Sequence, residues 1–260
     1  MRFIAHCLLL CTAIAFLFTP VIASADDSDG IYSEPELILG DTRGLTSLFR
    51  MPDIAGAGYN VFGDNKYVAL TFDDGPHKLY TAQILDILAE YGVKATFFIV
   101  GKNCEKYPEL VKREIDDGHE VGNHTYSHPD IGTLDESGLV HEVLAAEETL
   151  QGLREYKPKL FRPPAGKYNA AIDRIIAKLN YTAVLWNVDT QDWKAPATEK
   201  ITARVFKNVK PGNIILMHDY VVGKSHTPES LRVILPQLIE QGYRFVTMSE
   251  LIRASGNGQE

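Results

Sequence analysis

The chain has 260 residues, of which 45% are hydrophobic and 23% charged, and its formal net charge is -8. This acidic balance argues against nucleic acid and anionic membranes as the main partners. The length suits one large α/β domain with a substantial hydrophobic core, and we expect a monomer.

Residues 1–25 predict a removable export signal. Arg2 precedes an apolar stretch at residues 4–18, and Ala23-Ser24-Ala25 offers small side chains at the positions that signal peptidase recognises. A membrane anchor is the alternative, but the apolar stretch is shorter than the roughly 20 residues that a spanning helix needs. We therefore expect a secreted, periplasmic or cell-envelope protein without an integral membrane segment after cleavage.

Cysteine usage agrees with this interpretation. Removal of the signal takes away Cys7 and Cys11 and leaves Cys104 alone, so no internal disulfide can form. We interpret Cys104 as a buried small hydrophobic residue rather than as a nucleophile, because free cysteine is usually buried.

Residues 26–65 lack regular periodicity and predict an N-terminal extension that drapes over the domain. From residue 66 the pattern changes to short apolar runs that alternate with amphipathic stretches. The predicted strands cover residues 67–72, 95–100, 181–186 and 214–217. The predicted helices cover residues 81–91, 108–117, 134–156, 170–179, 198–209 and 229–241.

This alternation predicts one domain with a mainly parallel α/β architecture over residues 66–253, followed by a flexible tail at residues 254–260. A barrel and a doubly wound open sheet both fit the periodicity. In either case, the chemically active side chains should gather beyond the carboxyl ends of the strands.

The first candidate motif is Thr-Phe-Asp-Asp-Gly-Pro at residues 71–76, at the end of a predicted strand. Neighbouring strand side chains point in opposite directions, so Asp73 and Asp74 can share one centre only where the backbone turns. Gly75-Pro76 supplies such a turn. The alternative interpretation is an Asp-rich turn that caps the next helix.

The second motif is His-Thr-Tyr-Ser-His-Pro at residues 124–129. Imidazoles four residues apart converge on one face of a helical turn, and Pro129 limits this helix to a single turn. Together with Asp74, His124 and His128 would form a two-His, one-carboxylate set suited to a divalent ion. A surface histidine pair is the alternative.

The remaining motifs are Arg-Pro-Pro-Ala-Gly at residues 162–166, Asp-Thr-Gln-Asp-Trp at 189–193 and Leu-Met-His-Asp at 216–219. The prolines make a stiff support from which Arg162 could orient a carboxylate. A surface arginine on a structural loop and an ordinary hydrogen-bonded His218 are the alternatives. All five motifs, however, follow predicted strands or short strand-like segments, which are residues 120–123 before the second motif and a short apolar segment before Arg162. The carboxyl ends of strands are where α/β enzymes assemble their sites.

With these five motifs in this order, residues 66–253 resemble the polysaccharide deacetylase family, also called the NodB homology domain or carbohydrate esterase family four. The resemblance implies a distorted (β/α) barrel with seven repeats. It also implies that Asp73 is the general base, that Asp74, His124 and His128 bind the metal, and that His218 is the general acid.

Four further assignments follow from the resemblance. Arg162 would orient Asp73, and Asp189 or Asp192 would hold His218, with Asp189 favoured as the buried partner of Arg162. The backbone N–H of Ala165 would stabilise the oxyanion, and Trp193 and Leu216 would line an acetyl pocket. Many relatives carry an aromatic residue in place of Ala165, and Tyr168 could replace the sugar contacts of that residue.

The implied activity is metal-dependent hydrolysis of N-acetyl groups on an amino-sugar polymer or oligosaccharide, with release of acetate. The glycan would be chitin-like, peptidoglycan or an exopolysaccharide, and the metal Zn²⁺, with Co²⁺ or another divalent ion as alternatives. Alternative activities are O-acetyl ester hydrolysis on a xylan-like glycan and cyclic-imide hydrolysis. A non-catalytic sugar-binding domain and a metal-free aldose-type barrel are further alternatives, but the latter leaves the Asp-His-His set unexplained.

Overall fold

The computed structural model describes residues 48–49 and 65–256, and the side chains of residues 65–256. All of these residues belong to one structural unit, residues 35–260. The predicted export signal and most of the predicted extension lie outside the described residues. No helix in the described ranges is long and apolar enough to span a membrane.

The described strands form one sheet in which every pair is parallel. They are β1 (Leu48–Phe49), β2 (Lys66–Asp73), β3 (Thr96–Ile99), β4 (Glu120–Asn123), β5 (Leu160–Phe161), β6 (Thr182–Val184), β7 (Val188–Asp189), β8 (Ile214–His218) and β9 (Tyr243–Val246). The strand order is β1-β6-β5-β4-β3-β2-β8-β7, and β9 pairs with the first half of β2.

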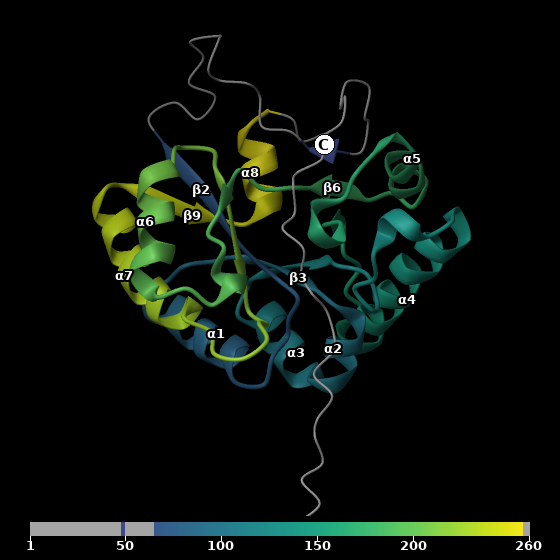
Figure 1. The fold of residues 1–260 in the computed structure, drawn as a ribbon, viewed down its shortest axis with the longest axis horizontal. Coiled ribbons are helices and arrows are strands. Elements are labelled where there is room, and N and C mark those ends of the chain that lie inside the picture. Colours follow the sequence, from purple (N-terminus) through teal and green to yellow (C-terminus); the bar gives the residue numbers. More distant parts are fainter. Residues whose placement is uncertain (1–47, 50–64, 257–260) are drawn as a thin grey trace, which may run out of the picture. The chain divides into compact units, whose positions relative to one another are not determined.

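Helices surround the sheet (Figure 1). They are α1 (Tyr80–Glu90), α2 (Gly101–Lys106), α3 (Pro108–Asp116), α4 (Glu136–Arg154), α5 (Ala170–Lys178), α6 (Thr198–Asn208), α7 (Thr227–Glu240) and α8 (Met248–Ala254). In the described chain, each of β2, β3, β4, β5, β8 and β9 leads into a helix, and β6 and β7 together lead into α6, which makes seven strand–helix units. The predicted distorted barrel of seven repeats is confirmed, and the doubly wound alternative is wrong.

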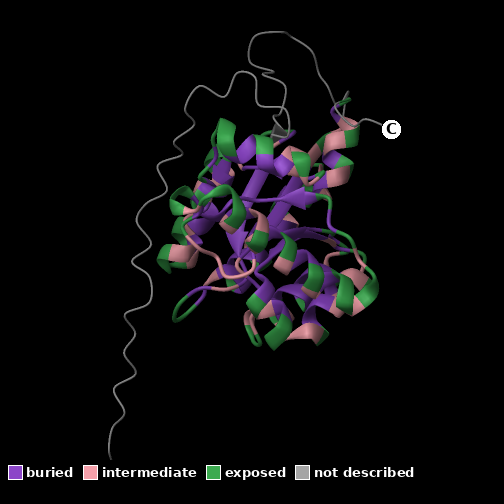
Figure 2. Cartoon of the chain, turned by 90° about the vertical axis from the view of Figure 1, so that its right-hand side faces the viewer, coloured by how far each residue is buried: buried purple, intermediate pink, exposed green. Residues whose placement is uncertain are grey.

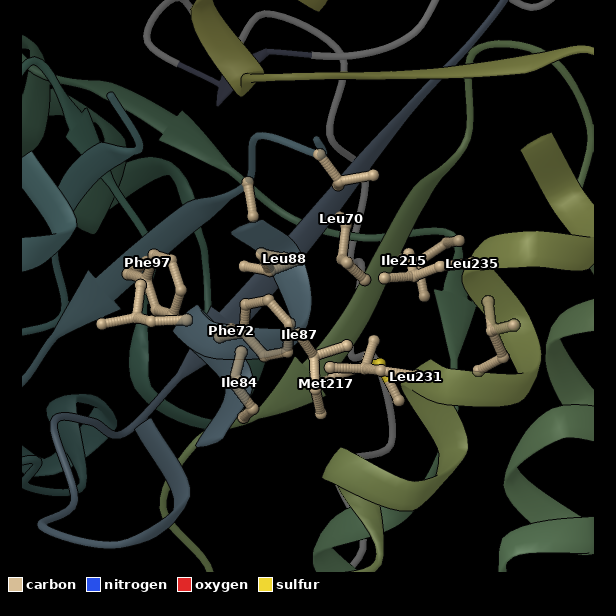
Figure 3. Close-up of a cluster of buried hydrophobic side chains, with 14 of the residues drawn as sticks. Leu70, Phe72, Ile84, Ile87, Leu88, Phe97, Ile215, Met217, Leu231 and Leu235 are labelled. Carbon is tan, nitrogen blue, oxygen red and sulfur yellow. The ribbon is translucent and has the colours of Figure 1, made fainter. Parts of the chain in front are cut away.

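Successive side chains of β2 point to opposite faces of the sheet and belong to two different hydrophobic clusters. Leu70 and Phe72 pack outward against residues of α1 and α7 (Figure 3). Ala69 belongs to an inner cluster with residues of β3, β5, β6, β8 and α8. Thr71 and Asp73 lie on the same strand face as Ala69, so the strand pleat places their polar side chains inside the barrel.

Burial follows this arrangement (Figure 2): the strands other than β9 are largely buried, and most exposed residues lie on helices and loops. The barrel interior is closed at the amino ends of β3 and β4 by α8, whose Met248 and Leu251 are fully buried. The N–H of Met248 donates to Thr96 Oγ1, and that of Ser249 donates to Glu120 Oε2.

Each predicted strand and helix is present, with ends displaced by a few residues at most. The helices α2 and α8 and the strands β1, β7 and β9 were not predicted, because each is too short to show a period. The start of α8 nevertheless has a signature, since Thr247 and Glu250 form a capping box. This helix runs through Ala254, one residue beyond the predicted domain boundary, and β1 lies within the predicted extension.

His119 makes the stability of this fold pH-dependent. Its Nδ1 accepts the backbone N–H of Ala95 at 3.2 Å, and burial lowers its pKa from 6.5 to about 4. The unfolded chain therefore binds more protons than the folded chain between these pH values, and stability falls as the pH falls from 6.5 to 4. Once the pH lies below both pKa values, His119 has lowered the free energy of unfolding by roughly 3 kcal/mol.

We expect the His119→Asn variant, which keeps an acceptor oxygen but cannot titrate in this range, to lose less stability than the wild type between pH 6.5 and 4. Urea unfolding of both proteins in a chelating buffer measures this difference without a contribution from bound metal. An equal loss of stability by both proteins between pH 6.5 and 4 would show that His119 is not responsible for the pH dependence.

Candidate active site

The strand ends bring the sequence motifs together. Asp73 and His218 are register partners at the ends of the adjacent strands β2 and β8. His124 and Arg162 follow Asn123 and Phe161, which are register partners at the ends of β4 and β5. The expectation that the chemistry gathers at the carboxyl ends of the strands is therefore confirmed for these residues.

Asp74, His124 and His128 form a cluster that could hold a metal ion. Asp74 Oδ1 lies 3.4 Å from His124 Nε2 and 3.2 Å from His128 Nε2. Among the described residues, this is the one group of three or more histidine, cysteine, aspartate or glutamate side chains whose ligand atoms lie within 4.8 Å of one another. Tetrahedral zinc with bonds of about 2.0–2.1 Å would place its ligand atoms roughly 3.3 Å apart.

The protonation and burial of these groups also fit a cation. His124 Nδ1 lies 2.7 Å from the carbonyl oxygen of Arg162, so Nδ1 carries a hydrogen and Nε2 faces Asp74. Asp74 Oδ1 is buried without a hydrogen-bond partner. Burial raises the pKa of Asp74, but the neighbouring His128 and His124 outweigh this effect and lower it. A buried carboxylate oxygen facing two imidazole nitrogens is an appropriate donor set for a divalent ion.

The loop at residues 124–129 holds the two histidines without a helical turn, so the predicted turn is wrong. Thr125 and His128 have φ values of 67° and 55°, which break the helical path. Glu142 of α4 fixes the loop, because its carboxylate accepts hydrogen bonds from the N–H groups of Tyr126 and Ser127 and from Ser127 Oγ. The imidazoles converge because of this bracing, with ring centroids 5.0 Å apart.

The turn predicted after Asp73 is present. Asp74 has φ 74°, and this turn lets both aspartates face His124, whose Nε2 lies 3.9 Å from Asp73 Oδ2. A Cβ at position 75 would lie 1.9 Å from Asp219 Oδ2, so only glycine fits there.

Arg162 holds Asp73 from inside the barrel. The guanidinium is fully buried against the ring of Phe98, 4.1 Å from its centroid, and Nη1 donates to Asp73 Oδ1 and Thr71 Oγ1, both at 2.8 Å. The expectation that Asp189 is the buried partner of Arg162 is wrong. Its Oδ1 accepts the N–H of Gln191, because β7 lies beyond β8, on the far side of β2 from β5.

Asp192 is the partner of His218. Its Oδ1 lies 2.8 Å from His218 Nδ1, and its Oδ2 accepts hydrogen bonds from the N–H of His218 and from Thr227 Oγ1. Burial lowers the pKa of His218, but the Asp192 carboxylate outweighs it and raises this pKa to about 10. The imidazole is therefore a cation at neutral pH, with its Nδ1–H donated to Asp192.

The structure shows the burial and local conformation of four other predicted residues. Ala165 is exposed in the turn Pro164–Gly166 with φ 53°, Leu216 is buried on the strand face that carries His218, and Trp193 is half-buried. Tyr168 is only 4% exposed and donates from its hydroxyl to Asp173 Oδ1, which argues against the predicted sugar contact. Cys104 is buried and unpaired, as expected.

Several supporting residues were not predicted from the sequence. Thr71, Glu142 and Thr227 have no local signature, because each acts on a partner that is distant in the chain. Asp219 was noted only as the neighbour of His218, although its Oδ2 accepts a hydrogen bond from Thr81 Oγ1 at 2.5 Å.

Comparison with known proteins agrees with this geometry. Residues 61–184 match the family model described as polysaccharide deacetylase. A peptidoglycan-N-acetylglucosamine deacetylase of Bacillus cereus is 41% identical over 197 residues, which cover 75% of this chain and 92% of that protein. A chitooligosaccharide deacetylase of Bradyrhizobium is 33% identical over 74% of this chain and 94% of its own length.

Among solved structures, a family 4 acetyl xylan esterase from Clostridium thermocellum in complex with a cobalt ion superposes with a TM-score of 0.70. It is 34% identical, and the match covers 74% of this chain and 93% of that chain. The chain belongs to the polysaccharide deacetylase family.

The pKa of His218 should depend on the carboxylate of Asp192. The Asp192→Asn variant removes this anion, so the pKa of His218 should fall well below its wild-type value. NMR titration of the imidazole protons in the metal-free protein measures this directly. If catalysis needs protonated His218, the alkaline limb of the kcat profile should also move to lower pH, and an unchanged His218 pKa would contradict the assigned pairing.

Proposed function

We propose that the chain is a metal-dependent hydrolase that removes N-acetyl groups from an amino-sugar glycan and releases acetate. The observation that carries this proposal is the convergence of Asp74, His124 and His128 on one point, with Asp73 within 4 Å of His124 and His218 on the adjoining strand. Such a set combines ligands, a base and an acid, which are the groups that amide hydrolysis needs.

Asp74, His124 and His128 would hold the metal. Two imidazoles and a carboxylate suit Zn²⁺, and Co²⁺ or another divalent ion fits the same donors. When bound, the ion would lower the pKa of water and polarise the acetyl oxygen.

Side chains and one backbone N–H of the protein would carry out the other steps of the reaction. Asp73, oriented by Arg162, would accept the proton of the attacking water. His218, charged and held by Asp192, would donate a proton to the departing nitrogen. The backbone N–H of Ala165 would donate to the developing oxyanion, a contribution typically worth about 3–4 kcal/mol. Leu216 and Trp193 would line the acetyl pocket, and Asp189 would add negative charge near His218.

The relatives support a glycan with N-acetyl groups as the substrate. The two relatives compared above are named for peptidoglycan N-acetylglucosamine and for chitooligosaccharide. An O-acetyl ester is the second candidate, because a structural neighbour is an acetyl xylan esterase. The peptidoglycan deacetylase relative and the predicted export signal support a location outside the cytoplasm, at the cell envelope or secreted.

Acetate release from a panel of glycans tests the reaction and its substrate. The panel contains N-acetylglucosamine oligomers, peptidoglycan, an acetylated exopolysaccharide and acetylated xylan, each with and without a chelator. We expect release from an N-acetylated glycan that the chelator abolishes and added Zn²⁺ or Co²⁺ restores. Release from xylan alone would favour the esterase, and binding without release would favour a sugar-binding domain.

Substitutions should separate the ligands from the acid and the base. We expect Asp73→Ala and His218→Ala to reduce acetate release by at least about a hundredfold while metal binding is largely preserved, because general acid–base groups typically contribute that much. His124→Ala and His128→Ala should lose both properties. Activity assays and metal analysis of the dialysed proteins measure this.

His141→Ala is the matched control, since this exposed histidine of α4 lies outside the cluster and should change neither property. Normal turnover by the Asp73→Ala variant would overturn the assignment of the base.

A further inference from the structure

The helix α2 is attached to the loop that carries the two proposed histidine ligands. The N–H of Gly101, its first residue, donates to the carbonyl oxygen of Thr125 at 3.0 Å. The N–H of Lys102 donates to the carbonyl oxygen of Tyr126 at 2.9 Å. Both acceptors lie between the two histidines, in the loop at residues 124–129. The backbone of α2 therefore helps to fix the position of both imidazoles.

The close approach of α2 to this loop depends on a glycine. A Cβ at position 101 would lie 2.6 Å from Cδ2 of the Tyr126 ring and 3.1 Å from Tyr126 Cα, so any larger residue would push the helix and the loop apart. The hydroxyl of Tyr126 also donates to Glu105 Oε2 of the same helix at 3.1 Å. The separation between α2 and the histidine loop is therefore set by packing as well as by hydrogen bonds.

The same helix is attached to the turn that carries the carboxylate ligand. Asn103 Nδ2 donates to the carbonyl oxygen of Asp74 at 2.7 Å. The N–H of Val100, the residue directly before the helix, donates to the carbonyl oxygen of Gly75 at 3.0 Å. The helix α2 thus connects the turn that carries Asp74 to the loop that carries the histidines.

Asp74 needs this support because its backbone adopts an unfavourable conformation. Its φ of 74° lies in the left-handed region, which residues other than glycine adopt rarely and keep only where the surroundings hold them. Its Oδ1 is buried without a hydrogen-bond partner, so the position of the backbone sets the direction of this oxygen toward the imidazoles. Loss of the hydrogen bond from Asn103 would remove one of the restraints on this backbone.

The contact with Asp74 accounts for an asparagine at position 103. Asn103 is half-buried and lies inside α2, where asparagine is a poor helix former. The cap of this helix is Val100, so the Asn103 side chain is not used for capping. It donates instead to a residue 29 positions earlier in the chain. The side chain therefore serves a contact between distant segments rather than the helix itself.

We propose that Asn103 is a positioning residue of the metal site, which holds the Asp74 carboxylate where it can bind the same divalent ion as His124 and His128. Asn103 would act through the backbone of a ligand and would touch neither the ion nor the substrate. This inference rests on the proposed function, because it concerns the metal that the proposed reaction uses.

The test removes the donor in two ways, since Asn103→Leu keeps the approximate size of the side chain and Asn103→Ala does not. We expect both full-length variants to bind Zn²⁺ about tenfold more weakly in titrations against a competing chelator, because residues that support metal ligands typically contribute that much. The visible absorption spectrum of the Co²⁺-loaded variants should also change, since it depends on coordination geometry. Acetate release should be low at limiting Zn²⁺ and recover at saturating Zn²⁺.

Asn208→Leu and Asn208→Ala on α6 are the matched controls. Asn208 Nδ2 donates to the carbonyl oxygen of Arg204 at 2.8 Å, which is the same kind of hydrogen bond at an exposed position outside the metal cluster. These two variants should keep the Zn²⁺ affinity and the Co²⁺ spectrum of the wild type. The melting temperature of each metal-free protein shows whether a variant is folded.

The outcomes separate this inference from the proposed function. Unchanged Zn²⁺ affinity in both Asn103 variants would overturn the inference and leave deacetylation intact. Wild-type affinity in Asn103→Leu alone would also overturn it, because packing rather than the donor would then matter. If only one variant folds, its affinity decides; if neither folds, Asn103 serves stability and the inference is overturned. A wild type that binds neither Zn²⁺ nor Co²⁺ would contradict the proposed function and this inference together.

Discussion

The candidate site depends on one buried arginine. The guanidinium of Arg162 lies inside the barrel and donates to Asp73, while the backbone of the same residue accepts from His124 Nδ1 and donates to the carbonyl oxygen of Asn123. One residue thus orients the proposed base, accepts a hydrogen bond from one proposed metal ligand and joins β5 to β4. A charge buried in this way is stable only because it is paired and hydrogen-bonded, so the arrangement tolerates little displacement.

The interior of the barrel explains why such a group can be held there. Phe98 stacks against the guanidinium, the ring of Trp186 lies 5.7 Å from the same cation, and the carbonyl oxygens of Val184 and Leu185 accept hydrogen bonds from its Nε and Nη2. Burial lowers the pKa of Arg162, but its normal value is so high that the group stays charged. The pairing therefore holds the Asp73 side chain in a fixed orientation inside the barrel.

The site contains several close pairs of acidic and basic side chains. Asp73 pairs with the cation of Arg162, Asp74 faces the imidazoles of His124 and His128, and His218 pairs with Asp192. Asp219, buried below the turn after Asp74, experiences the two aspartates, and burial together with these charges raises its pKa to about 7. Concentrated negative charge of this kind favours a divalent cation, in agreement with membership of the polysaccharide deacetylase family.

The sequence by itself determined the alternation of strands and helices, the turn after Asp73 and the roles expected for Asp74, His124 and His128, because periodicity and motif chemistry are local properties. It misjudged the partner of Arg162, the conformation of the histidine loop and the position of Tyr168. These depend on which strands become neighbours and on residues such as Glu142 and Thr227 that brace the motifs from distant helices. Only the tertiary structure decided them, because hydrogen bonds between segments far apart in the chain leave no periodic trace in the sequence.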